Sequence, residues 1–90
     1  MTISKKLFRT GPYADFYSQA VQVGDSIFLS GQVGIDDAGT VPSDLLSQMS
    51  LAYKNIETIL MEYGASLDNI VDETWFVTDI NDCMAQVPAL

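Results

Sequence analysis

Apolar residues with a preference for β-structure occur in two short runs on either side of Gly24-Asp25. The first run contains Ala20, Val21 and Val23, and the second contains Ile27, Phe28 and Leu29. A two-residue linker that includes glycine, placed between two such runs, is typical of a β-hairpin. The pattern therefore predicts two strands joined by a tight turn over residues 19–33.

A different period follows between Ser43 and Tyr63, where apolar residues recur every three or four positions. This spacing places them along one face of an amphipathic helix, so we expect a helix over residues 43–63. Ser43 is the expected N-cap, Asp44 suits the positive end of the helix dipole, and Gly64 suits the stop. The apolar stripe consists of Leu45, Met49, Ala52, Ile56, Ile59, Leu60 and Tyr63.

Two further segments show weaker strand patterns. Residues 2–8 alternate loosely and predict a short strand. Residues 70–78 are rich in β-formers and predict a strand with Trp75 and Val77 on one face and Phe76 on the other. Because a long helix separates this strand from the hairpin, the chain is expected to form one α+β domain over residues 1–90, with the helix across one sheet face.

The end of the chain predicts a second helix. Asp79 and Asn81-Asp82 are good capping residues, and we expect the helix to begin at Cys83. Cys83 itself is interpreted as a small buried hydrophobe, because nothing else in the sequence marks its thiol as reactive.

The formal net charge is −8, with only four lysine and arginine residues. Such a surface repels phosphate backbones, so we expect no nucleic-acid partner. The absence of histidine removes the usual general base and the commonest metal ligand. The single cysteine excludes an internal disulfide and a cysteine-cluster zinc site, so we expect no metal and no cofactor. Asp36-Asp37 lies in a loop and is interpreted as part of a solvated turn, not as a cation site.

The sequence also predicts a location. No apolar run approaches the length that spans a bilayer, so we expect no membrane association. Lys5 and Lys6 are not followed by the apolar core of a secretory signal. With one unpaired cysteine, these features favour a reduced, cytoplasmic compartment.

The candidate ligand site lies at Ser30-Gly31, directly after the second strand of the hairpin. A small hydroxyl followed by glycine lets a ligand approach the backbone closely. Tyr17, one of three aromatics in the loop before the first strand, is the best-placed pocket wall. The alternatives are that the loop aromatics Tyr13, Phe16 and Tyr17 cover the core and that the Ser30 hydroxyl satisfies nearby backbone groups. Ser30 has no activating base in sequence range, so it is not expected to be a nucleophile.

Several blocks of the sequence occur together in an order that resembles the RidA/YjgF/UK114 family of reactive intermediate deaminases. They are Tyr17-Ser18-Gln19-Ala20-Val21, Phe28-Leu29-Ser30-Gly31-Gln32-Val33, Leu51-Ala52-Tyr53-Lys54-Asn55-Ile56, Gly64-Ala65-Ser66-Leu67-Asp68-Asn69-Ile70-Val71 and Thr74-Trp75-Phe76-Val77-Thr78-Asp79-Ile80-Asn81-Asp82. The resemblance spans most of residues 11–85.

This resemblance implies a chorismate-mutase-like α+β subunit with a mixed sheet and helices on one face. It also implies a homotrimer with ligand clefts between neighbouring subunits. Family members typically hydrolyse 2-imino acids, such as 2-iminobutanoate and 2-iminopropanoate, to 2-keto acids and ammonia. By position, Tyr17, Ser30 and Gly31 match family residues that contact the small 2-imino or 2-keto acid ligand.

The sequence departs from the family pattern at the catalytic pair. The family arginine that anchors the ligand carboxylate, and the glutamate that orients water, lie on strands beyond the second helix. Those strands have no counterpart here, Arg9 does not match the arginine's motif position, and Pro88 stands where many members carry asparagine. We therefore expect a RidA-type subunit without its C-terminal strands, and a sheet with an unpaired edge.

Three functions follow from these observations. The first is an imine or enamine deaminase, which is a hydrolase. The second is a non-catalytic module of the same fold that binds small carboxylates or a protein partner. The third is an endoribonuclease or translation inhibitor, which ranks last because it needs cationic phosphate contacts and an acid–base pair.

Overall fold

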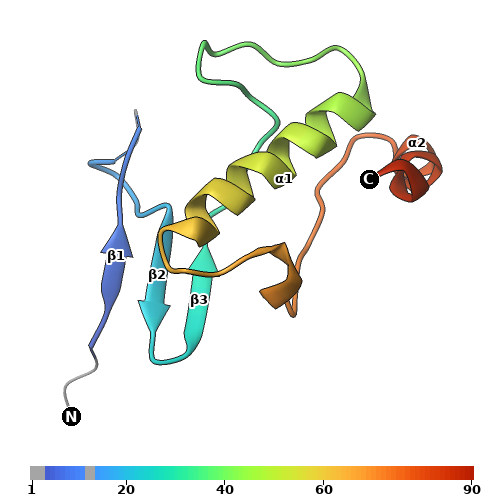
Figure 1. The fold of residues 1–90 in the computed structure, drawn as a ribbon. Helices are drawn as coiled ribbons and strands as arrows, with labels where there is room; N and C mark the ends of the chain where they lie inside the picture. The colour runs from blue at the N-terminus through green and yellow to red at the C-terminus, as the bar shows by residue number, and fades with distance from the viewer. Residues whose placement is uncertain (1–3, 12–13) are drawn as a thin grey trace. The chain divides into compact units, whose positions relative to one another are not determined.

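The computed structural model describes residues 4–11 and 14–90, and Figure 1 shows the order of the elements along the chain. It forms two compact units, Met1–Gln32 and Val33–Leu90, which are described separately. The first unit contains three strands, and the second contains two helices with two short 3-10 turns. The elements are β1 (Lys6–Phe8), β2 (Ala20–Val23), β3 (Ser26–Leu29), α1 (Leu45–Met61), η1 (Leu67–Asn69), α2 (Ile80–Gln86) and η2 (Val87–Ala89).

The first unit is a three-stranded antiparallel sheet in the order β1-β2-β3. Val23 lies opposite Ser26, so Gly24-Asp25 is the two-residue turn that the sequence predicts. Gly24 has a φ of 59°, a left-handed conformation that glycine adopts without steric cost and that this turn requires. The predicted hairpin is confirmed.

The strand predicted over residues 2–8 is confirmed for Lys6–Phe8, which pairs with β2. Residues 2 and 3 of that prediction lie outside the described part of the chain, and so does Tyr13 in the loop before β2.

Helix α1 in the second unit confirms the predicted amphipathic helix, but its N-cap differs. Asp44, not Ser43, is the N-cap: its backbone is extended and its carboxylate accepts a hydrogen bond of 2.9 Å from the Ser47 N–H. Aspartate satisfies an orphan N–H as serine would, and it adds a negative charge at the positive helix end. The same hydrogen bond lowers the pKa of Asp44.

The predicted stop at Gly64 is confirmed: α1 ends at Met61, and Gly64, with a φ of 70°, lies in the turn that closes the helix. The Gly64 N–H donates to the Met61 carbonyl at 3.1 Å, and the Ala65 N–H donates to the Leu60 carbonyl at 3.0 Å. This pair of hydrogen bonds is the Schellman pattern, which uses a left-handed glycine to satisfy the last helix carbonyls.

The predicted apolar stripe supplies the buried residues of α1, which are Met49, Ile59 and Leu60. Cys83 of α2 is fully buried, as expected of a small hydrophobe. The predicted start of α2 is wrong, because the helix begins at Ile80. Asp79, one of the predicted capping residues, is the N-cap: its carboxylate accepts from the Asp82 N–H at 3.1 Å, and the helix starts directly after it.

The strand predicted over residues 70–78 is wrong: this stretch has neither strand nor helix. A β-strand exists only where a neighbouring backbone completes its hydrogen-bond ladder. In the described residues, no other segment pairs with this one. Two of its side chains instead contact α1 within the second unit. The Tyr53 hydroxyl donates to Glu73 at 2.9 Å, and the Tyr53 and Trp75 rings pack edge-on with their centroids 6.3 Å apart.

We expect Tyr53 to make the protein sensitive to alkali. Partial burial, and then the Glu73 carboxylate, raise the pKa of Tyr53 to about 12 in the folded state. Since an unfolded tyrosine titrates near 10, the stabilisation by neutral Tyr53 is complete below about pH 10 and is lost as the pH rises through about 12. In urea unfolding at pH 8 to 12, Tyr53→Phe should therefore lower the free energy of unfolding most at pH 8 and least at pH 12. An equal cost at both ends would contradict this assignment.

The loop before α1 is held against the helix by hydrogen bonds from one side chain and by a close contact between two backbone segments. The Asn55 side-chain amide donates to the carbonyls of Val33 and Ile35, at 3.0 Å in both cases. Gly34, between them, lies against the backbone carbonyl of Gln48, and a Cβ there would overlap that carbonyl. The position requires glycine because of space, not because of its φ.

Gly34→Ala should therefore lower the free energy of unfolding by about 1–3 kcal/mol, because one backbone segment has to move. Gly31→Ala is the matched control: a Cβ at Gly31 meets nothing within 4 Å, and its stability should change little. Urea unfolding of both variants measures the difference, and equal stabilities would show that the Gly34 contact relaxes without cost.

Candidate functional site

The predicted site residues lie at one end of the first unit. Ser30 and Gly31 directly follow β3, and Tyr17 lies shortly before β2. Ser30 is half-buried, Gly31 is exposed, and Tyr17 is 40% exposed. Phe16 is 79% exposed, so the interpretation in which the loop aromatics cover the core does not hold for that residue.

The backbone of Gln19 holds Ser30 in place. The Gln19 N–H donates to the Phe8 carbonyl at 2.7 Å, and the Gln19 carbonyl accepts from the Ser30 N–H at 3.0 Å. The antiparallel pairing therefore continues past the ends of the strands, and it fixes Ser30 by the same ladder that forms the sheet.

The Ser30 hydroxyl takes part in a network of amide groups. It donates to the Gln19 carbonyl at 3.2 Å, and it lies 3.5 Å from Nε2 of Gln32, which can donate to it. The same Nε2 is 3.1 Å from Oε1 of Gln19, whose own Nε2 donates to the Thr10 carbonyl at 3.1 Å. The interpretation in which Ser30 satisfies nearby backbone is thus confirmed. Because its proton is engaged, Ser30 meets a ligand mainly as a hydrogen-bond acceptor.

Arg9 braces the loop that leads to β2. Its Nε donates to the Ser18 hydroxyl at 3.0 Å, and its Nη1 donates to the Ala14 carbonyl at 3.3 Å. Two N–H donors of the guanidinium bind the loop. The guanidinium itself also places a positive charge at this end of the sheet. Arg9 therefore helps to hold the segment that carries Tyr17.

Gly31 is the exposed glycine of the predicted site. Its φ lies outside the left-handed region, and an added Cβ would meet nothing within 4 Å. Neither backbone conformation nor packing within the described chain requires a glycine here. A glycine at this position leaves room for another molecule to approach the backbone.

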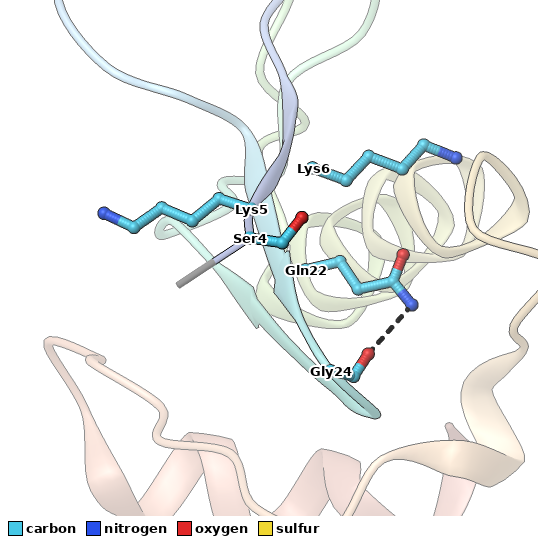
Figure 2. A pocket seen from close by; sticks show the side chains of 5 residues that line it. All are labelled: Ser4, Lys5, Lys6, Gln22 and Gly24. Carbon is cyan, nitrogen blue, oxygen red and sulfur yellow. Dashed lines mark hydrogen bonds between the residues drawn. The ribbon is translucent and has the colours of Figure 1, made fainter. Parts of the chain in front are cut away.

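A shallow hollow of about 270 Å³ lies elsewhere in the first unit, at the opposite end of β2. In Figure 2, Gln22 reaches toward Gly24, and the Lys5 and Lys6 side chains extend in opposite directions. Gln22 Nε2 donates to the Gly24 carbonyl at 3.2 Å. Because the two ammonium groups do not converge, the hollow does not form an anion site, and it does not include Tyr17, Ser30 or Gly31.

The loop with Asp36 is a turn, as expected. One carboxylate oxygen of Asp36 accepts from the N–H groups of Ala38 and Thr40, at 3.0 and 2.8 Å. This pattern is an Asx-type turn. Within residues 4–11 and 14–90 there is no group of three or more acidic, cysteine or histidine side chains placed to hold a metal ion. In the same described ranges, no helix has the length and apolar character needed to cross a membrane.

Sequence reasoning missed Gln19 and Gln32 as site residues. Both lie inside the conspicuous blocks around the hairpin, but amide side chains have no diagnostic spacing and were not weighed as part of the site. The available signal was position: Gln19 precedes β2 and Gln32 follows Ser30-Gly31, so antiparallel pairing brings them to the same end of the sheet.

Gln19→Ala should lower the free energy of unfolding by about 1–2 kcal/mol, because the side-chain bonds to Thr10 and Gln32 are both lost. Gln22→Ala, within β2, removes one exposed hydrogen bond of a side-chain amide and should lower the free energy of unfolding by less than about 1 kcal/mol. Thermal and urea unfolding compare the two. If Gln22→Ala lowers the free energy of unfolding as much as Gln19→Ala does, the hydrogen-bond network around Gln19 has no special role in stability.

Comparison with known proteins identifies the family. The family model described as Endoribonuclease L-PSP matches residues 10–90. The chain is 43% identical over 63 residues to the RutC family protein YjgH of Escherichia coli, covering 70% of this chain and 48% of that protein. It is 41% identical over 68 residues to 2-iminobutanoate/2-iminopropanoate deaminase of mouse, covering 73% of this chain and 50% of that enzyme. The chain thus spans about half the length of these curated relatives.

Solved structures agree with the sequence comparison. The structure of YjgH superposes with a TM-score of 0.78 at 36% identity, covering 92% of this chain and 67% of that one. A protein of the Rid family from Yersinia pestis superposes with a TM-score of 0.81 at 30% identity, covering 96% of this chain and 72% of the other. The α+β fold class is therefore confirmed, and the chain belongs to the Endoribonuclease L-PSP family, which is the RidA/YjgF family.

Proposed function

We propose that this chain carries the ligand-binding half of a RidA-type site, which takes a small 2-imino or 2-keto acid at Ser30 and Gly31. One observation carries the proposal: Ser30 is fixed by the sheet, and it is followed by a glycine that the fold does not require. The mouse relative, named as an imine deaminase, supports the class of ligand.

The proposed chemistry is hydrolysis of the imine. Water adds to the electrophilic imine carbon: a C–O bond forms, the C=N π bond breaks, and one water proton passes to the nitrogen. The C–N bond of this carbinolamine then breaks as its hydroxyl proton passes to the nitrogen, and ammonia and the 2-keto acid leave. Orientation of the ligand and of one water supplies much of the rate increase, and no cofactor is consumed. On this chain, Ser30 Oγ would accept from the imine N–H, and the exposed backbone at Gly31 would contact the ligand.

The site is proposed to be completed by a neighbouring subunit of a homotrimer, as the family resemblance implies, and the single cysteine favours a cytoplasmic location. Tyr17, on the loop braced by Arg9, would form one wall of that cleft. The chain's 48% hydrophobic content gives each subunit apolar surface for such contacts. One relative, mmf2 of Schizosaccharomyces pombe, is named as mitochondrial. The proposed activity therefore does not depend on the proposed cytoplasmic location.

A second candidate is a binding module without catalysis. It is favoured by the Ser30 hydroxyl, whose proton is engaged by the Gln19 carbonyl, and by the absence of histidine from the sequence. Ribonuclease activity is the weakest candidate, because the net charge of −8 opposes the phosphate backbone.

Calorimetric titration with 2-oxobutanoate, followed by an assay of 2-iminobutanoate generated in situ, tests the proposal. Wild type should bind the keto acid, and Gly31→Ala should bind about tenfold more weakly, because its methyl group fills the space that the ligand needs. Gln22→Ala is the control and should bind like wild type. Binding with accelerated hydrolysis supports the deaminase, and binding without it supports the module. No binding by wild type would contradict both.

A further inference from the structure

The side-chain amides of Gln19 and Gln32 form a chain of hydrogen bonds whose direction is fixed by backbone carbonyls. The Thr10 carbonyl can only accept, so Gln19 presents Nε2 to it and turns Oε1 toward Gln32. Gln32 must then point its own Nε2 at Gln19. The Ser30 carbonyl, 3.3 Å from the same Nε2, is a second acceptor that requires this orientation. Two backbone groups thus decide which end of the Gln32 amide faces the protein.

The other end of that amide, Oε1 of Gln32, is left as an acceptor that water can reach. In residues 4–11 and 14–90, no group donates a hydrogen bond to it. Gln32 is half-buried, and among the described residues no polar side-chain atom is buried without a hydrogen-bond partner. An Oε1 atom without a partner is therefore accessible, and it belongs to the residue next to the exposed Gly31.

The hydroxyl oxygen of Ser30 is a second acceptor close to the first. Its own proton goes to the Gln19 carbonyl, and it lies 3.5 Å from Nε2 of Gln32. Because the oxygen and nitrogen of an amide are only about 2.3 Å apart, Oε1 of Gln32 lies within about 6 Å of Ser30 Oγ. A single nitrogen that donates two hydrogen bonds of about 2.9 Å each can bridge two acceptors at such a separation.

We propose that Gln32 is a specificity-determining residue, which together with Ser30 selects the ligand by the N–H donors on its C2 nitrogen. The inference rests on the proposed function and refines its ligand. Of the two N–H groups of a protonated 2-imino acid, one would bind Ser30 Oγ and the other Gln32 Oε1. A 2-keto acid has an oxygen in that place, which cannot donate and faces two acceptors. The site therefore favours the imino substrate over the keto product, and this difference helps the product to leave.

Two stable ligands of similar size test the preference. Oxamate carries a planar NH2 group on the carbon next to its carboxylate, whereas pyruvate carries a methyl group and a keto oxygen there. In calorimetric titrations, the wild-type protein should bind oxamate about tenfold more tightly than pyruvate, because oxamate satisfies acceptors that pyruvate leaves unpaired.

Two variants show whether Gln32 is the source of the preference. Gln32→Met keeps the length of the side chain but removes Oε1, so the oxamate preference should fall below about threefold. Gln22→Met removes an exposed amide at the other end of β2 and should keep the wild-type preference. The ratio of two dissociation constants does not change when part of the protein unfolds, so a merely structural role of Gln32 would leave this ratio unchanged.

The wild-type protein provides a second test that holds even if Gln32→Met does not fold. In nuclear magnetic resonance titrations, the side-chain carbonyl carbon of Gln32 should shift with oxamate and much less with pyruvate, because only oxamate donates to Oε1. Equal wild-type affinities for the two ligands, an unchanged ratio in Gln32→Met, or equal carbonyl shifts would overturn the inference and leave the proposed function standing. Binding of neither ligand would overturn both.

Discussion

The carbonyl of Gln19 is the acceptor on which the candidate site depends. It receives both the backbone N–H and the hydroxyl of Ser30, while the Gln19 N–H bonds to Phe8. The residue thus extends the sheet by one step and positions Ser30 with the same interactions. Since the Gln19 side chain also joins Thr10 to Gln32, the site is attached to three segments and does not rely on a flexible loop.

The second unit is organised by α1, which serves more than one purpose. Its buried residues form the core with Cys83 of α2, and Asn55 on the same helix clamps the backbone on both sides of Gly34. Tyr53, also on α1, fastens the segment that contains Trp75. Loss of helix order would therefore release both the loop before α1 and the segment after it.

The sequence predicted the elements whose signals are local. The Gly24 turn, the α1 stripe and the Gly64 stop depend on neighbouring residues and were confirmed. Residues 70–78 were predicted as a strand because their side chains suit one, but a strand also needs a partner backbone, which composition does not reveal. Ser30 and Gly31 were found from a local motif. The hydrogen bonds from Gln19 and Gln32 were missed because they depend on which residues the sheet brings together.

The most direct measurement of the central claim is a nuclear magnetic resonance titration of the labelled protein with 2-oxobutanoate, following every backbone and glutamine side-chain amide. We expect the largest shifts on the backbone amides of Ser30 and Gly31 and on the side-chain amides of Gln19 and Gln32, with little change at Gln22 near the turn. Shifts confined to other residues, or none at saturating ligand, would contradict the assignment of the site to this end of the sheet.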